Sequence, residues 1–324
     1  MKSGSNLEKV LTAGHFAVTA ELGPPIGANA AEVRKKMELL RGCADGYNIT
    51  DCQTAVVRMS SIAGAILLHQ GGMEPVMQMT TRDRNRIAIQ ADVLGAAALG
   101  VKNCLCIAGD HQSFSAAGQL RGHPGAKNVY DVDSIQLVAM LKGMRDEGIL
   151  QSGDPLVEPV PLFIGAAWTP MADPVEWRVI RLGKKVAAGA DFIQTQGIYD
   201  VRQFAEVMKK VRNRGLHEKT AILAGIIVPK NRGMLRYMNQ SVAGVSVPDE
   251  MIARFPVIKK SMEPAERKEL RARTRQLAKD ITVELIEQCR EIEGIAGAHL
   301  QAIEWEAAIP DIVKAAGLHP RPSV

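Results

Sequence analysis

Two acidic residues at the ends of apolar runs are the clearest candidates for chemistry in this sequence. Glu21 lies near the end of FAVTAEL, residues 16–22, and Asp110 follows VKNCLCIAG, residues 101–109. A carboxyl group on a buried strand is costly unless it is ionised and paired, or neutral and able to donate a proton. The two residues therefore indicate acid–base or charge-stabilising chemistry, if the fold brings the two strand ends together.

Polar residues also follow the other apolar runs, and this arrangement is asymmetric. The segments that begin the runs carry mostly turn residues, whereas the segments that end them contain TDCQ (50–53), QMTTRD (78–83), TQ (195–196) and EW (304–305). Such a concentration at one end of every strand is typical of the mouth of a barrel enzyme.

The elements that would position these residues alternate between strand and helix patterns. Strands are predicted at 16–22, 46–51, 74–80, 101–108, 161–168, 191–196, 221–228 and 296–303. Helices are predicted near 30–41, 58–70, 85–99, 131–147, 174–188, 200–213, 232–239 and 306–316. Parallel neighbours need long crossovers, so eight such units predict an α/β fold, a (β/α)8 TIM barrel. No GxGxxG follows the first strand and no GxxxxGK[ST] occurs, which disfavours the common open-sheet nucleotide folds.

Two segments depart from the alternation of predicted strands and helices. Residues 240–292 contain PDEMIARF and a strongly charged helix, and they predict an enlarged helical crossover between the seventh and eighth strands. Residues 111–130 form a long Gly-, Ser- and His-containing loop, which indicates function. We expect one barrel domain over residues 1–324, with 1–14 as an N-terminal segment.

The composition limits the function classes. The 324 residues carry a net charge of +5 and are 46% hydrophobic, without a run of about 18 apolar residues that would span a membrane. Five cysteines without zinc spacing predict a reducing, cytoplasmic location and no metal site. No aromatic-laced basic cluster indicates nucleic acid, the mild positive charge favours anionic small ligands, and an oligomer is possible.

Each candidate residue also has a purely structural interpretation. Glu21 could form a salt bridge with Arg82 or Lys230 at the barrel rim, and Asp110 could cap a turn. Gln196 lies two residues after Gln194 and could belong to a polar layer inside the barrel.

Four segments together resemble the flavin-dependent methylenetetrahydrofolate reductase family, and most closely its short acetogen-type branch. They are TAELGPP, MTTRDRNRIAIQADVLGAAALGVKNCLCIAGD, KKVAAGADFIQTQGIYD and GIIVP, and the likeness runs from about residue 14 to 310. The resemblance implies a barrel that holds FAD, or FMN in some relatives, across the strand ends, with the folate stacked on the flavin.

The resemblance also implies roles for individual residues. Glu21 takes the position of the general acid in Glu-x-x-Pro-Pro, Asp110 that of the carboxylate beside the pterin, and Gln196 that of the glutamine that contacts folate. Trp305 stands on the substrate side, where the family has an arginine. The implied flavin-binding residues are Thr50, Asp51, Gln53, Gln78, Ala108, Gly109, Asp110, Tyr130, Asp131, Trp168, Lys184 and Lys185. The two lysines could equally be ordinary solvated helix charges.

The implied reaction is reduction of 5,10-methylenetetrahydrofolate to 5-methyltetrahydrofolate. Glu21, with a pKa raised by burial, would protonate the departing amine, and the Asp110 carboxylate would stabilise the cationic iminium. Leu22-Gly23, Ala108 and Trp305 differ from the bacterial family pattern where nicotinamide would stack. The electron donor is therefore open between a nicotinamide and a partner subunit with an iron–sulfur or zinc site.

Two other functions fit the same sequence. One is a pterin-binding methyltransferase that passes the methyl group to a corrinoid protein, and the other is a non-catalytic subunit that acts only within a complex.

Overall fold

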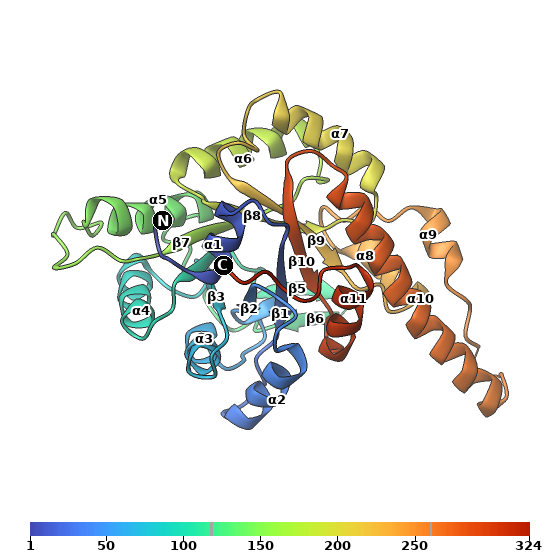
Figure 1. The fold of residues 1–324 in the computed structure, drawn as a ribbon. Coiled ribbons are helices and arrows are strands. Elements are labelled where there is room, and N and C mark those ends of the chain that lie inside the picture. The colour runs from blue at the N-terminus through green and yellow to red at the C-terminus, as the bar shows by residue number, and fades with distance from the viewer. Residues whose placement is uncertain (117–118, 260) are drawn as a thin grey trace.

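Eight parallel strands close into a barrel with helices around its outer face (Figure 1). The structure is a computed structural model that describes residues 1–116, 119–259 and 261–324, with the backbone alone for the strand residues in 114–121. Around the barrel the strand order is β1-β10-β9-β8-β7-β4-β3-β2, and each neighbouring pair is parallel. The predicted TIM-type α/β barrel is confirmed.

Each barrel strand overlaps one of the predicted apolar runs. The strands are β1 (Ala17–Leu22), β2 (Gly46–Ile49), β3 (Pro75–Thr80), β4 (Asn103–Ile107), β7 (Phe163–Trp168), β8 (Phe192–Gly197), β9 (Ala221–Ile227) and β10 (Ile295–Gln301). Because a closed parallel barrel buries both faces of its strands, near-continuous apolar runs are what this fold requires.

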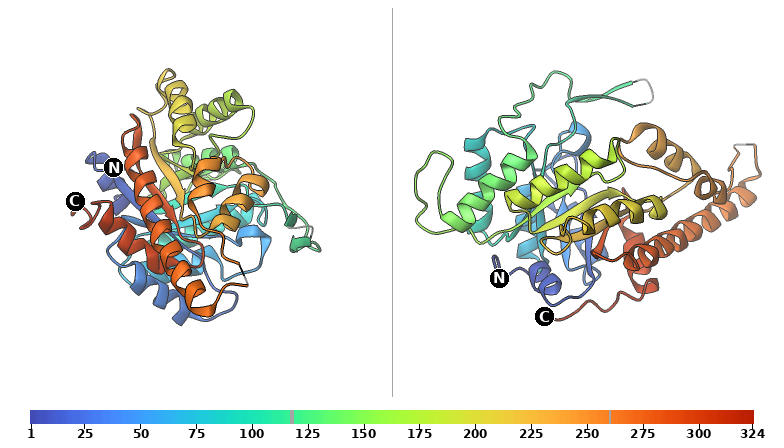
Figure 2. Two further views of the ribbon diagram at one scale, coloured as in Figure 1. Left: turned by 90° about the vertical axis from the view of Figure 1, so that its right-hand side faces the viewer. Right: turned by 90° about the horizontal axis from the view of Figure 1, so that it is seen from above.

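The chain returns through a helix after every barrel strand. In order, these helices are α2 (Ala30–Leu40), α3 (Ser61–Gln70), α4 (Arg86–Ala98), α5 (Ser134–Lys142), α6 (Val175–Ala188), α7 (Val201–Arg212), then α8 (Arg232–Ser241), α9 (Asp249–Arg254) and α10 (Pro264–Arg290) between β9 and β10, and finally α11 (Ile309–Ala315). Short helical turns η1 (Gln53–Ala55), η2 (Gly143–Glu147) and η3 (Glu306–Ala308) complete the set. The amino-terminal part of α10 projects away from the barrel (Figures 1 and 2).

The segment expected to be a loop at 111–130 contains a β-hairpin, so that prediction needs correction. Strands β5 (Ser113–Ala116) and β6 (Gln119–Gly122) pair antiparallel and project from the barrel (Figure 2). The signal was weak because each strand is only four residues long and the pair forms a sheet separate from the barrel, so no long apolar run marks it.

The amino-terminal segment closes the bottom of the barrel. Helix α1 (Asn6–Thr12) begins at Ser5, whose side chain accepts a hydrogen bond from the Glu8 N–H. Its Leu7 and Val10 are fully buried in a cluster with residues inside the barrel, including Phe163 and Phe192. These two rings stack with centroids 5.1 Å apart. The strand starts are thus filled by apolar side chains.

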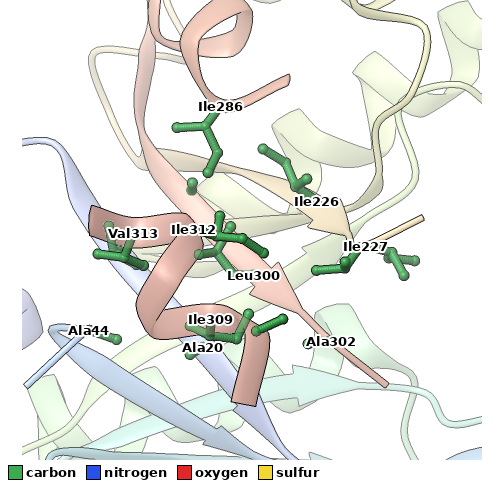
Figure 3. Close-up of a cluster of buried hydrophobic side chains, with 14 of the residues drawn as sticks. Ala20, Ala44, Ile226, Ile227, Ile286, Leu300, Ala302, Ile309, Ile312 and Val313 are labelled. Atoms are coloured by element: carbon green, nitrogen blue, oxygen red, sulfur yellow. The ribbon is translucent and has the colours of Figure 1, made fainter. Parts of the chain in front are cut away.

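A second apolar layer lies between the barrel wall and the surrounding helices. Figure 3 shows one part of it, where Ile226 and Leu300 of neighbouring strands meet Ile286 of α10 and Ile312 of α11. All four side chains are almost fully buried. Among the residues that the structure describes, no helix is both long and apolar enough to cross a bilayer.

Candidate functional site

A cavity of about 660 Å³ opens at the carboxyl-terminal ends of the strands. Its volume is in the range of small-molecule sites. The residues proposed from sequence that border it are Glu21, Thr50, Asp51, Gln53, Gln78, Gly109, Asp110, Trp168 and Gln196. Glu21 of β1 and Asp110, which follows β4, therefore face one shared space.

Glu21 is bound by an amide rather than by a cation. Gln301 Nε2 of β10 donates to Glu21 Oε2 at 3.0 Å, and Arg82 instead pairs with Asp83 at 2.6 Å. Burial raises the pKa of Glu21, the nearby Glu306 carboxylate adds to that effect, and the hydrogen bond from Gln301 opposes it. A carboxyl group in such surroundings retains its proton to a higher pH and can act as an acid.

An ion pair lies behind Glu21. Lys36 Nζ of α2 contacts Glu306 Oε1 at 2.5 Å and donates to the Gly23 carbonyl at 3.0 Å. Both charged side chains border the cavity. Glu306 raises the pKa of Glu21 and Lys36 lowers it, and the effect of Glu306 is the larger of the two.

Asp110 holds a strained turn at the rim. Its Oδ2 accepts a hydrogen bond from the Thr54 N–H at 2.7 Å, so it does cap a turn, but one from the loop after β2. Cys52, Thr54 and Ala55 all have φ near +50°, an arrangement that costs energy in non-glycine residues and is common at functional sites.

Arg82 stabilises the loops at the Asp110 turn through hydrogen bonds to their backbone. Its guanidinium donates to the Cys52 carbonyl at 3.1 Å and to the Asp110 carbonyl at 2.9 Å, and the residue is only 2% exposed. It therefore links the loops that follow β2 and β4.

Asp51 is occupied by protein partners. Its Oδ2 accepts from the Thr80 N–H at 2.9 Å and hydroxyl at 2.8 Å, and Arg84 donates to both carboxylate oxygens at 2.7 and 3.2 Å. Its role is to hold the ends of β2 and β3 together.

Gln53 is oriented by its neighbour Thr50. Its Oε1 accepts a hydrogen bond from the Thr50 hydroxyl at 2.8 Å, and its amide nitrogen lies near Gly23.

The cavity floor is a buried polar layer of four residues from four strands. Gln194 Nε2 donates to Thr19 Oγ1 and to Asn48 Oδ1, each at 3.0 Å, and Asn48 Nδ2 donates back to Gln194 Oε1 at 2.7 Å. Thr19 Oγ1 lies 2.9 Å from His299 Nδ1. Burial lowers the pKa of His299 to about 3, so its imidazole is neutral. This layer separates the apolar lower half of the barrel from the cavity.

A β-bulge in β8 turns Gln196 toward the cavity. The register against β9 shifts between Gln194 and Gly197, and the Thr195 carbonyl lies so close to Gly225 that a Cβ there would be 2.0 Å away. Bulges of this kind redirect side chains beside active sites. Gln196 Oε1 accepts from the Gly197 N–H at 3.0 Å, which leaves its amide group for a ligand.

A family model described as methylenetetrahydrofolate reductase matches residues 6–317. The chain belongs to the methylenetetrahydrofolate reductase family.

Several solved structures of low sequence identity are similar to this chain, and one of them, with a TM-score above 0.5, shares its fold. One is described as an uncharacterized protein from Clostridium thermocellum that binds two copies of 5-methyl-5,6,7,8-tetrahydrofolic acid; it is 15% identical, with 96% of this chain and 99% of that chain covered and a TM-score of 0.59. A 2,3-dimethylmalate lyase is 12% identical, with 98% of this chain and 90% of that chain covered and a TM-score of 0.46. An oxaloacetate acetylhydrolase is 12% identical, with coverage of 97% and 84% and a TM-score of 0.47.

Several residues that the family resemblance implied for the flavin do not reach the cavity. Lys184 lies over the Trp177 ring at 5.5 Å, and the Lys185 Nζ donates to the Ala167 carbonyl. Burial lowers the pKa of Lys185 to about 8. Both lysines belong to α6, on the outside of the barrel wall, so they face the helical layer and the surface.

Trp168 borders the cavity only at the barrel wall. Because strand residues alternate between faces, its ring lies on the outer side, where it packs against Phe204 and donates from Nε1 to the Arg178 carbonyl at 2.9 Å. It therefore offers no stacking surface inside the cavity.

The remaining positions lie beyond the cavity lining. Asp131 pairs with Arg86 at 2.8 Å, and this cation lowers the pKa of Asp131 to about 2. Tyr130 donates weakly to the Gly109 carbonyl at 3.5 Å, Ala108 contributes its carbonyl to the Arg82 N–H, and Trp305 packs against the outer apolar layer. Local partners hold each of these residues.

Sequence reasoning missed the residues of other elements that lie around Glu21. Gln301, His299 and Asn48 came from strands that were correctly predicted, and their inward parity was a usable signal. Glu306 and Lys36 gave no such signal, because both lie on helical segments.

Proposed function

We propose that this chain reduces 5,10-methylenetetrahydrofolate to 5-methyltetrahydrofolate with a bound flavin, and that Glu21 is the general acid. One observation carries the proposal: in a chain of this family, Glu21 with a raised pKa and Asp110 border the same cavity. The reaction needs a proton for the departing amine and a negative group near the cation that remains.

The cavity fits the ring system of a flavin. Gln301 Oε1 is buried without a hydrogen-bond partner among the described residues, and it would accept an N–H from a heterocycle. Gln53, Gln78 and Gln196 add amide groups for the edges of a flat ring. The residues expected near the diphosphate and adenosine lie elsewhere, so FMN suits the described lining as well as FAD does. When bound, a reduced flavin supplies the hydride.

The side chains of the protein perform the remaining steps. Glu21, held by Gln301, gives its proton to the amine nitrogen that leaves the methylene bridge. Asp110 accepts from Thr54 through Oδ2, which leaves Oδ1 to face the cationic iminium. Gln196 orients the pterin, and the polar layer that contains Gln194 and His299 closes the cavity below the ring.

Substitution of Glu21 tests this proposal. The purified chain, loaded with FAD or FMN, is assayed for methylenetetrahydrofolate reduction with a viologen dye, which makes no assumption about NADH or a partner subunit. Glu21→Gln should lower folate reduction by about 10²–10⁴-fold, because the positioned acid is lost. Flavin reduction by the dye should survive. Glu287→Gln, on the exposed face of α10, is the matched control.

Two results would count against the proposal. A chain that binds neither flavin has no hydride source of this kind. Equal loss of folate reduction and flavin reduction in Glu21→Gln would assign Glu21 to the structure of the site instead.

Folate binding without flavin is the second candidate. The outward position of the Trp168 ring and the distant lysines weaken the case for a dinucleotide. The clostridial protein of the same fold is described as binding two copies of a methyltetrahydrofolate. A methyltransferase or a non-catalytic subunit would bind the pterin and show no flavin absorbance.

A further inference from the structure

One cation at the cavity has no charge partner. Of the described lysine and arginine side chains that border it, Lys36 pairs with Glu306 at 2.5 Å and Arg82 pairs with Asp83 at 2.6 Å. Arg58 forms no ion pair with any described carboxylate. Its charge is therefore available to a ligand.

The hydrogen-bonding capacity of Arg58 is also largely unused. Nη1 donates to the Pro24 carbonyl over a long 3.3 Å. Nε is buried and has no partner within the described part of the chain. A buried N–H without an acceptor is costly, and an arginine fork is well suited to a planar carboxylate or a phosphate.

Arg58 contacts the chain shortly after Glu21, and both residues border the same cavity. Pro24 follows Glu21 by three residues, so the contact lies within about 11 Å of Glu21 along the chain. Val57, which precedes Arg58, is 63% exposed, and Ile26, two residues after Pro24, is 71% exposed, so each of the two segments that this contact joins carries an exposed apolar side chain.

We infer that Arg58 binds the anionic group of the ligand and that it favours a pterin whose aryl portion ends in a glutamate carboxylate. This inference rests on the proposed function, because it places the ring system of that ligand beside Glu21. The same chemistry would suit the phosphate of a flavin nucleotide. The exposed Ile26 and Val57 on the two contacting segments favour the folate source, since an aryl spacer offers them apolar surface.

Paired ligands that differ only in the anion test the inference. Binding is measured by calorimetry for tetrahydrofolate against tetrahydropteroate, for FMN against riboflavin, and for the fragment p-aminobenzoylglutamate alone. Arg58→Gln should weaken tetrahydrofolate about 10- to 100-fold, since a charge-assisted hydrogen bond is lost, and leave tetrahydropteroate unchanged. Arg58→Lys should recover part of the loss, and Arg34→Gln on the exposed face of α2 is the control.

The outcomes separate the inference from the proposed function. A loss confined to FMN would overturn the assignment to a glutamate carboxylate and would identify the phosphate as the anion that Arg58 binds. Equal losses for both members of each pair, or no loss at all, would overturn the inference. If the wild-type chain binds neither pterin nor flavin, the proposed function fails. In that case, binding of p-aminobenzoylglutamate by the wild type and not by Arg58→Gln would still uphold the inference. If neither protein binds this fragment, the inference is overturned as well. Unchanged thermal midpoints show that the variants fold.

Discussion

The polar floor of the cavity should behave as one unit, and Gln194→Leu is the substitution that tests it. The change removes three hydrogen bonds that join Gln194 to Asn48 and Thr19. It leaves both polar atoms of the Asn48 amide buried without a partner. The hydrogen bond between Thr19 and His299 remains.

The expected cost follows from the two orphaned groups. Each buried, unsatisfied group costs about 1–3 kcal/mol, so the two together cost about 2–6 kcal/mol; the added leucine surface offsets about 1–2 kcal/mol, which leaves a net loss of about 1–4 kcal/mol. Given the unfolding entropy expected for 324 residues, a loss of 1 kcal/mol in the free energy of unfolding lowers the Tm by about 1.5 °C. Gln194→Leu should therefore lower the Tm by about 1.5–6 °C.

A double-mutant cycle read by thermal unfolding is the decisive assay. Asn48→Leu/Gln194→Leu removes both partners, so its loss should be smaller than the sum of the single losses, by about 2 kcal/mol or more. Exposed Gln288→Leu on α10 is the control for the same chemical change. Strictly additive losses, or an unchanged Tm for Gln194→Leu, would refute the idea that these residues form one network.

Two further predictions concern the site. Gly225→Ala should lower the Tm and weaken ligand binding, because a Cβ would lie 2.0 Å from the Thr195 carbonyl. The control Gly183→Ala on α6, where the nearest atoms lie 3.8 Å from the added Cβ, should be neutral or slightly stabilising. Equal behaviour of the two variants would contradict the role of the bulge. The raised pKa of Glu21 means that its contribution to stability is present below the unfolded pKa and lost as pH rises through the folded pKa. The Tm of Glu21→Gln relative to wild type should therefore increase above about pH 4.5, and a flat difference would show that burial does not perturb this carboxyl group.

The barrel could be predicted because its signal is local. Every barrel strand coincides with an apolar run, and the alternation with helices requires parallel pairing. The position of Glu21 and Asp110 at one rim followed from the same rule, since parallel strands place their carboxyl ends together.

Other parts of the site depended on contacts that no local pattern reveals. Lys185 and Lys184 are adjacent in sequence, yet one turns inward to the Ala167 carbonyl and the other lies over Trp177. The direction of a long side chain on a helix is decided by what packs beside it. The parity of β7, in contrast, could have placed the Trp168 ring on the outer face.

The amino-acid order by itself determined the element types, their sequence around the barrel and the end at which polar groups gather, because these follow from hydrophobic period and chain connectivity. Only the closed tertiary structure decided the chemistry of the site. Thr19 and His299 are 280 residues apart, and Glu21 and Gln301 are separated by the same distance in sequence. Closure of the barrel brings β1 against β10, removes water from between these side chains, and so raises the pKa of Glu21 and lowers that of His299.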